Sequence, residues 1–341
     1  RGIADRRANY ALRFTGVLNV PEAETFHFTT WATGQTKLRI DGEIVNQQEG
    51  APSNRTNAGN VTLSKGDHDF DLRIVQHVSW NAYNLSYRKT KSNEPARSLN
   101  TMEQKKAIAT PRAQNPRELK TDDDPFLLRS FLYFPAPKLY EEATKRTHVI
   151  SVGEGEGPHY SVDLQTGALL QAWRGEFADV HDMWNGRGEP QVMRPLGAAI
   201  QFSGDMLTAD SATDPWPGPP EDPDEDDFAH LVHALDEAGR PVFEYDAGAG
   251  LITDHIVPNE GGLLREINHS AGGNSSQYVQ LVAARTIEEV APGEFALRSP
   301  GLKIRIESYD GSGLTLQRDG DLQRLIAELP AKGHVRYQID W

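Results

Sequence analysis

The sequence has 341 residues, of which 38% are hydrophobic and 25% are charged, and it contains no cysteine. This length allows two or three folded domains, and the composition is typical of a globular protein. The lack of cysteine excludes disulfides, zinc–thiolate sites, haem attachment through CxxCH and thiol catalysis. The net charge of −14 opposes binding to nucleic acid or to anionic lipid, and no apolar run reaches the roughly 18 residues of a membrane span.

Residues 10–89 consist of short alternating segments that are separated by Pro, Gly and Asn turns. Asp41-Gly42 lies between the apolar runs KLRI and EIV, which predicts a tight hairpin. In the segment GDHDFDLRIVQ, alternation predicts one face formed by Phe70, Leu72 and Ile74. This pattern is typical of an antiparallel β-sandwich.

The order of the segments YALRFTGVLNVPEAETFHFTT, KLRIDGEIV, GNVTLSKGDHDFDLRIV and NLSYR resembles the protective-antigen-type domain of bacterial toxins, glycosidases and yeast adhesins. The resemblance implies a jelly-roll β-sandwich over residues 1–89 that serves recognition, often of glycans. Sugar-binding members usually carry two adjacent aspartates and a glycine before the strand that ends in IDG, and the aspartates hold calcium. Here Trp31-Ala32-Thr33-Gly34 lacks both carboxylates. Because calcium needs about six to eight oxygen ligands, we expect no calcium or other metal site.

Residues 90–124 are polar, contain Pro95, Pro111 and Pro116, and predict a linker. The apolar segment PFLLRSFLYFPAP follows, and it predicts a buried strand with Phe126, Leu128 or Phe131 in the core of a second domain over residues 125–341.

The second domain shows the same strand pattern over longer segments. Turns are predicted at residues 163–167, 236–239 and 248–250, and GLKIRIESY alternates strictly between apolar and charged residues. Strands about ten residues apart indicate a large sandwich or barrel. Only residues 141–145 and Leu322–Leu329 have a pattern that a helix would also fit.

Several segments of this region, including HYSVDLQTGALLQAWRGEF, DVHDMWNGRGEPQ, RPLGAAIQFSG and VRYQIDW, resemble a domain of large bacterial periplasmic proteins. That domain accompanies c-type cytochrome and sugar-dehydrogenase-like modules, sometimes beside a protective-antigen-type domain. The resemblance spans residues 126–341 and implies a β-supersandwich of the kind seen in galactose mutarotases and polysaccharide-lyase accessory domains. It also implies a location in the periplasm or on the outer face of a bacterial membrane, and it carries no catalytic residues or cofactor.

The densest group of candidate ligand-binding residues is Asp179, His181, Asp182 and Trp184. On a strand, Asp179 and His181 would share one face and Asp182 and Trp184 the other. A His–Asp pair on one face would relay a proton in sugar chemistry. The alternative is a histidine hydrogen-bonded at a strand end, with Trp184 in the core.

Tryptophan rings stack on the apolar faces of sugars, so Trp31, Trp173, Trp184 and Trp216 are further candidates for ligand contact. Trp173 is placed near a strand end, where a ring can be exposed. The alternative for each ring is burial in a core. The stretch EDPDEDD at residues 221–227 lacks the spacing of an EF-hand, so it predicts a solvated acidic loop next to the rigid segment DPWPGPP.

Three functions are compatible with these features. The favoured one is a non-catalytic extracytoplasmic scaffold or accessory subunit that contacts other protein subunits of a periplasmic or membrane-associated assembly, such as an electron-transfer complex. The second is a carbohydrate-binding protein. The third is a sugar epimerase or lyase centred on His181 with Asp179 or Asp182.

Overall fold

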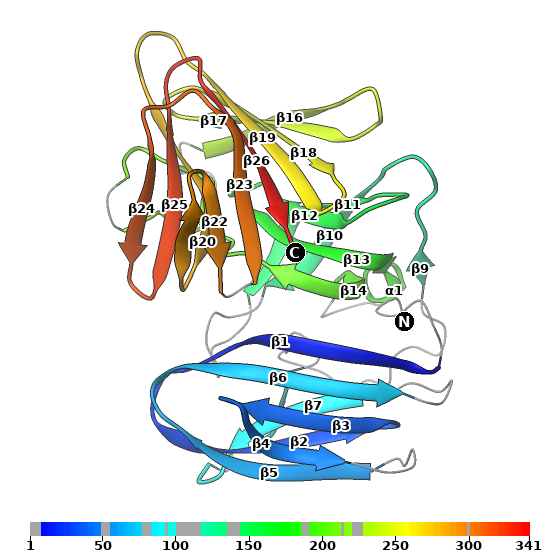
Figure 1. Cartoon of the computed structure of the whole chain (residues 1–341). Coiled ribbons are helices and arrows are strands. Elements are labelled where there is room, and N and C mark those ends of the chain that lie inside the picture. Colours follow the sequence, from blue (N-terminus) through cyan, green and yellow to red (C-terminus); the bar gives the residue numbers. More distant parts are fainter. Residues whose placement is uncertain are drawn as a thin grey trace. The chain divides into compact units, whose positions relative to one another are not determined.

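The computed structural model describes residues 8–48, 55–76, 83–92, 95–99, 117–134, 144–185, 191–212, 215–219, 228–298 and 301–341. The chain divides into two compact units, one of residues 1–114 and 133–145 and one of residues 115–132 and 146–341. In the described residues, antiparallel strands dominate and the one helix is the single turn α1 (His181–Trp184) (Figure 1). The predicted all-β class is therefore confirmed.

The first unit is a sandwich of two four-stranded sheets. One sheet has the order β1 (Tyr10–Val20), β6 (Gly66–Gln76), β3 (Gln35–Ile40) and β4 (Glu43–Gln48). The other has the order β5 (Arg55–Leu63), β2 (Glu24–Ala32), β7 (Tyr83–Lys89) and β8 (Arg97–Ser98). Apolar side chains from both sheets form one core that includes Phe26, Phe28, Leu38, Leu72 and Leu85. The predicted face of β6 is confirmed, since Leu72 and Ile74 are buried and Phe70 is half-buried.

The predicted hairpin at Asp41-Gly42 is also confirmed. Both residues have positive φ, 52° and 83°, as a two-residue turn that follows the right-handed strand twist requires. The Asp41 carboxylate accepts the backbone N–H of Asp69 at 2.8 Å, and its other oxygen lies 2.6 Å from Nδ1 of His68. This side chain therefore joins the β3–β4 turn to the neighbouring strand β6.

The second unit contains three antiparallel sheets (Figure 1). The six-stranded sheet has the order β10 (Phe126–Phe134), β11 (Thr144–Gly153), β12 (His159–Asp163), β13 (Leu169–Asp179) and β14 (Arg194–Gln201), with β9 (Glu118–Leu119) also paired to β13. The eight-stranded sheet has the order β16 (Phe228–Leu235), β17 (Pro241–Ala247), β18 (Leu251–Pro258), β19 (Gly262–Ser270), β26 (His334–Asp340), β23 (Leu302–Tyr309), β22 (Glu294–Leu297) and β21 (Ile287–Ala291). The four-stranded sheet has the order β15 (Thr208–Ala209), β20 (Gln277–Ala284), β25 (Leu322–Leu329) and β24 (Leu314–Asp319).

One hydrophobic core joins these three sheets. Its largest members are the fully buried side chains of Tyr160, Phe243, Tyr245 and Tyr337. A smaller cluster lies on the six-stranded sheet around Trp173 and Phe177. The strict alternation predicted for β23 is confirmed, because Leu302 and Ile304 are buried between exposed charged residues.

Three expectations for this unit need correction. The segment Leu322–Leu329 is not a helix but the central strand β25, and its run of four buried residues reflects burial on both faces. Phe126 is exposed, while Leu128 of the same strand is buried as predicted and Phe131 is half-buried. The end of the predicted linker includes β9, which pairs with β13 in the second unit. Residues 141–143 and most of the predicted linker lie outside the described residues.

A buried ion pair connects two strands of the eight-stranded sheet with a turn of the six-stranded sheet. Arg265 on β19 donates Nε to Asp254 Oδ1 at 2.9 Å and Nη2 to Asp254 Oδ2 at 2.7 Å, and both side chains are buried. The same Nη2 donates to the carbonyl of Gly167, in the β12–β13 turn, at 3.0 Å. Burial acts to lower the pKa of Arg265, but the Asp254 carboxylate outweighs it and holds that pKa above its usual value.

We predict that Asp254→Ala lowers the free energy of unfolding by about 3–5 kcal/mol, because it leaves the Arg265 charge buried without its partner. Urea denaturation at neutral pH measures this change. The matched control is Glu266→Ala, which removes the partly exposed partner of Arg336 and should cost less than about 1 kcal/mol. Equal losses in the two variants would contradict the structural role of the buried pair.

Candidate functional site

Four of the predicted site residues come together where β13 ends. Asp179 is the last residue of β13, and its Oδ1 accepts the backbone N–H of His181 at 3.0 Å. Val180 N–H donates to the carbonyl of Arg117 at 2.9 Å, and Trp184 N–H donates to the carbonyl of Val180 at 3.0 Å. These bonds turn the chain from a strand into α1. We call the group Arg117, Asp179, His181, Asp182, Trp184 and Arg194 the α1 site.

The predicted arrangement of this group on two faces of one strand is wrong. The strand stops at Asp179, and His181, Asp182 and Trp184 belong to the helical turn that follows. Asp182 pairs with Arg194 at the start of β14, with Arg194 Nη2 to Asp182 Oδ2 at 2.5 Å. The imidazole Nδ1 of His181 lies 3.4 Å from the side-chain nitrogen of Asn185. The carboxylate of Asp179 therefore fixes the backbone at the start of α1, and the carboxylate of Asp182 fixes the side chain of Arg194.

Trp184 is exposed, contrary to the alternative that placed it in the core. Its side chain retains 44% of its accessible surface. The guanidinium carbon of Arg117 lies 4.8 Å from the centre of the indole ring, which is a cation–π contact. Arg117 also donates to the side-chain oxygen of Asn185 at 3.5 Å. The sequence gives no signal for Arg117 and Arg194 at this site, because neither lies in a recognisable motif.

Trp173 and Trp216 are not sugar platforms, because both rings are buried. Trp173 is fully inaccessible and stacks on Phe177 with 5.9 Å between ring centres, and its Nε1 donates to the carbonyl of Phe177 at 2.9 Å. Trp216 Nε1 donates to the carbonyl of Met206 at 2.9 Å. Trp31 is half-buried on β2 of the first unit, opposite Asn84 of β7.

The segment Trp31-Ala32-Thr33-Gly34, for which we expect no calcium site, has a packing role for its glycine. Trp31 and Ala32 end β2, and Thr33-Gly34 turns the chain into β3. A Cβ atom added at Gly34 would lie 2.2 Å from the carbonyl oxygen of Val75, so only glycine allows this approach of two backbones. Gln76 donates its side-chain amide to the Thr33 hydroxyl. The Gln76 amide and the Thr33 hydroxyl therefore join the end of β6 to the turn between β2 and β3.

His159, upstream of the α1 site, is a structural histidine. Its Nδ1 accepts the backbone N–H of Glu154 at 3.0 Å, and its Nε2 lies 2.9 Å from the carbonyl of Gly175. The ring packs against the stacked pair Trp173 and Phe177, with centre distances of 5.5 and 5.3 Å. These contacts define the neutral tautomer with the proton on Nε2, and burial lowers the pKa of His159.

Glu154 forms a second interior ion pair, which the sequence did not indicate. Its side chain is buried, and Arg240 donates to it through Nε at 3.1 Å and through Nη2 at 3.0 Å. Burial raises the pKa of Glu154, and Arg240 opposes that rise. The pair joins the segment after β11 to the start of β17, so it serves the architecture of the second unit.

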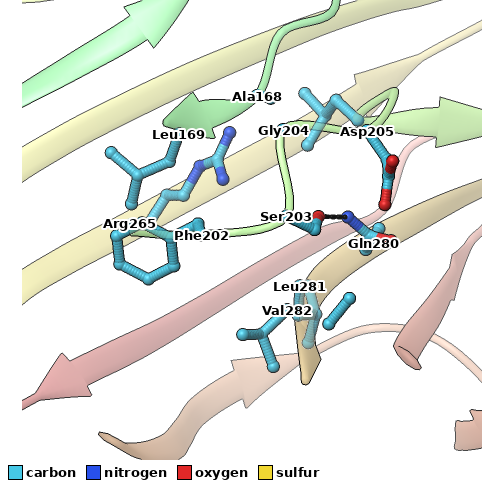
Figure 2. A pocket seen from close by; sticks show the side chains of 12 residues that line it. Ala168, Leu169, Phe202, Ser203, Gly204, Asp205, Arg265, Gln280, Leu281 and Val282 are labelled. Carbon is cyan, nitrogen blue, oxygen red and sulfur yellow. Dashed lines mark hydrogen bonds between the residues drawn. The ribbon is translucent and has the colours of Figure 1, made fainter. Parts of the chain in front are cut away.

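A small cavity lies among β13, β19 and β20 (Figure 2). Its volume is about 20 Å³, and it is lined by polar groups of Ser203, Asp205, Arg265 and Gln280 beside aliphatic side chains. Gln280 donates to the Ser203 hydroxyl at 3.0 Å. Such a volume holds one water molecule and no metabolite.

A wider groove lies between the eight-stranded and four-stranded sheets. It has a volume of about 350 Å³ and is lined by Phe295 and Leu325 at its base, Leu314 and Leu316 of β24, and Glu289 of β21. The Leu316 side chain is 42% exposed. We call this feature the β24 groove.

Within the residues that the structure describes, no group of three His, Asp or Glu side chains is placed to hold a metal ion. Among the same residues, no helix combines the length and the apolar character that crossing a bilayer requires. The acidic stretch at residues 221–227 lies outside the described residues, so its predicted solvation stays a prediction.

No protein-family model matches this chain, and no curated protein sequence matches it either. Among solved structures, an anti-sigma factor domain-containing protein superposes with a TM-score of 0.26 and 17% identity, covering 45% of this chain and 54% of that one. An anti-sigma factor domain-containing protein from Clostridium clariflavum superposes with a TM-score of 0.24 and 10% identity, covering 97% and 80%. Superpositions this weak carry no argument about fold or function.

We predict that His159 makes stability fall as the pH is lowered. Because its pKa is lower in the folded than in the unfolded protein, the unfolded chain takes up the proton more readily below the unfolded pKa of about 6.5. The His159→Gln variant should therefore lose less stability than the wild type between pH of about 7.5 and 5. Urea denaturation across that range measures how the free energy of unfolding changes with pH in both proteins.

The control for this prediction is His148→Gln, which replaces an exposed histidine of β11 in the same sheet. The free energy of unfolding of this control should change with pH as it does in the wild type. A His159→Gln slope parallel to the wild type would show that the imidazole stays protonatable in the folded state.

Proposed function

We propose that this chain is a non-catalytic scaffold or accessory subunit that binds other protein subunits through the exposed strands of its second unit. The observation that supports this most directly is the β24 groove, where Leu316 is exposed and Leu314 is half-buried beside the buried side chain of Phe295. Apolar anchors in such a groove are the usual centre of a protein contact. The buried polar groups of this unit, by contrast, are used to join its sheets.

The chemistry of the β24 groove defines the partner that fits it. The groove accepts an apolar side chain, and the Glu289 carboxylate at its margin favours a basic residue beside that anchor. The net charge of −14 acts in the same direction, because it attracts a basic partner at long range. We therefore propose a partner segment with an apolar anchor next to Lys or Arg.

The proposed location is the periplasm or the outer face of a bacterial membrane, within an assembly such as an electron-transfer complex. Support comes from the resemblance of residues 126–341 to domains of periplasmic multidomain proteins and from the lack of cysteine. This chain contributes contacts to such an assembly, and the proposal assigns it no cofactor.

The test is purification of the tagged chain from the organism that encodes it, beside the variant Leu316→Asp. We expect defined subunits to copurify with the wild type and to be lost, by about tenfold or more, with Leu316→Asp, because the apolar anchor of the partner would have to desolvate the new carboxylate. Raising the salt concentration should weaken the association.

The matched control is Leu251→Asp, which places the same charge at an exposed leucine on β18. It should retain every copurifying subunit. A wild-type chain that elutes alone at all salt and detergent concentrations, or a Leu316→Asp variant that keeps its partners, would reject the proposed use of the groove.

Carbohydrate binding is the second candidate function, and exposed Trp184 favours it. The ring lies beside Arg117 and near the Asp182–Arg194 pair, a combination of apolar platform and hydrogen-bonding groups that suits a sugar. We expect Trp184→Ala to abolish any glycan-array signal, while Trp31→Ala, in the other unit, leaves it unchanged. No signal on bacterial and plant polysaccharides, with or without calcium, would reject this function.

A further inference from the structure

Strand β16 forms one edge of the eight-stranded sheet, and β17 is its hydrogen-bonded neighbour in that sheet (Figure 1). Three of its apolar side chains are more exposed than those of most strands, with accessible fractions of 49% for Leu231, 53% for Val232 and 60% for Leu235. An edge strand presents unpaired backbone N–H and C=O groups, which makes it a template for another strand.

The composition of β16 sets it apart from the other sheet edges. Proteins protect exposed edges with charged residues or proline, and also with β-bulges, of which β16 has one at Leu231. In the described part of the chain, each other edge strand longer than two residues carries at least one such residue, as in Arg13 of β1, Glu43 of β4, Arg55 of β5, Arg129 of β10, Pro195 of β14, Glu289 of β21 and Arg318 of β24. The sequence of β16, FAHLVHAL, carries none.

The sequence of β16 is nearly the same when it is read backwards. Antiparallel pairing about a point between Leu231 and Val232 would place His230 opposite His233, Ala229 opposite Ala234, and Leu231 opposite Val232 of a second copy. A two-fold interface requires this kind of self-complementarity, because each residue must fit its counterpart in both directions. No carboxylate of the strand would meet another carboxylate, whereas on edge strand β21 Glu288 and Glu289 would.

A β-bulge in β16 makes this pairing geometrically consistent. In a regular strand, residues three apart lie on opposite faces, and an antiparallel pair must share a face. The register with β17 shifts at Leu231, so that His230 lies opposite Tyr245 and His233 opposite Phe243, both of them core residues. Both histidines therefore face the core side, and Ala229 and Ala234 both lie on the other side, opposite Asp246 and Val242.

From these observations we propose that two copies of this chain associate through antiparallel pairing of their β16 strands, which joins two eight-stranded sheets about a two-fold axis. This interface is independent of the β24 groove and of the partner proposed above.

The area and charge of this interface determine its strength. Pairing along eight residues buries less than the roughly 1,000 Å² total that marks a stable interface, so the dimer is weak and depends on concentration. Each copy also carries a net charge of −14, which repels the other at low ionic strength. Added salt therefore strengthens this dimer, in contrast to a contact that rests on opposite charges.

The first test is sedimentation equilibrium of the purified chain from about 1 μM to about 1 mM, at low and at moderate salt. We expect a monomer–dimer equilibrium whose dissociation constant falls as salt is raised. The variant Leu231→Lys should raise the dissociation constant by about tenfold or more, because it places a charge at the centre of the pairing. The control Val290→Lys places the same charge at an exposed apolar residue on β21, the opposite edge of this sheet, and should match the wild type.

The second test determines the register in which the two β16 strands pair. Because the chain has no native cysteine, introduced cysteines are its only thiols. Ala229→Cys and Ala234→Cys, mixed under oxidising conditions, should crosslink, because opposite residues place their Cα atoms about 4.5–5.5 Å apart, within the range of a disulfide. Each variant alone should not, because its two cysteines are five residues out of register, about 17 Å.

Either test can overturn the proposal. A monomer throughout the concentration series would refute the association, and a dimer that Leu231→Lys leaves intact would place it on another surface. Crosslinking that is as efficient in the separate variants as in the mixture would refute the register.

Discussion

The bidentate contact between Arg265 and Asp254 is the constraint on which the second unit depends. It brings a full charge pair into a core that three sheets share, and Nη2 of Arg265, which also bonds Asp254, reaches the β12–β13 turn at the carbonyl of Gly167. A buried charge is tolerated only when its hydrogen bonds are made, so the spacing of β18, β19 and this turn is tightly specified. Tyr160 and Tyr337 add hydrogen bonds from the same core to the carbonyls of Ile256 and Leu281.

This use of polar groups explains why the interior offers little room for a ligand. Arg265, Glu154 and His159 each have specific partners, and the cavity beside Arg265 has room for only one water. The features that remain for recognition are therefore on the surface: the β24 groove, the indole of Trp184 and the edge strand β16. They differ in chemistry. The β24 groove suits an apolar anchor beside a basic group, the Trp184 indole suits a sugar ring, and β16 suits another uncharged strand.

Part of the candidate site was predictable. The sequence placed Asp179, His181, Asp182 and Trp184 together because they are neighbours in the chain, and the structure keeps them together. It did not predict Arg117 or Arg194, which reach the α1 site because β9 and β14 both pair with β13. It also treated four tryptophans alike, although Trp173 is buried and Trp184 exposed. Two residues of one type differ in this way because burial is decided by strands that pair from distant parts of the chain.

What the sequence by itself determined is local: the all-β class, the hairpin at Asp41-Gly42, and the buried faces of β6 and β23, because turn conformation and side-chain alternation depend on adjacent residues. Only the tertiary structure decided that Leu322–Leu329 is a central strand, since a run buried on both faces has no periodicity to distinguish it from a helix. It also decided that β13 ends at Asp179 and that β16 lies at an edge. These outcomes depend on which strands pair across the chain, and that choice is made by long-range packing.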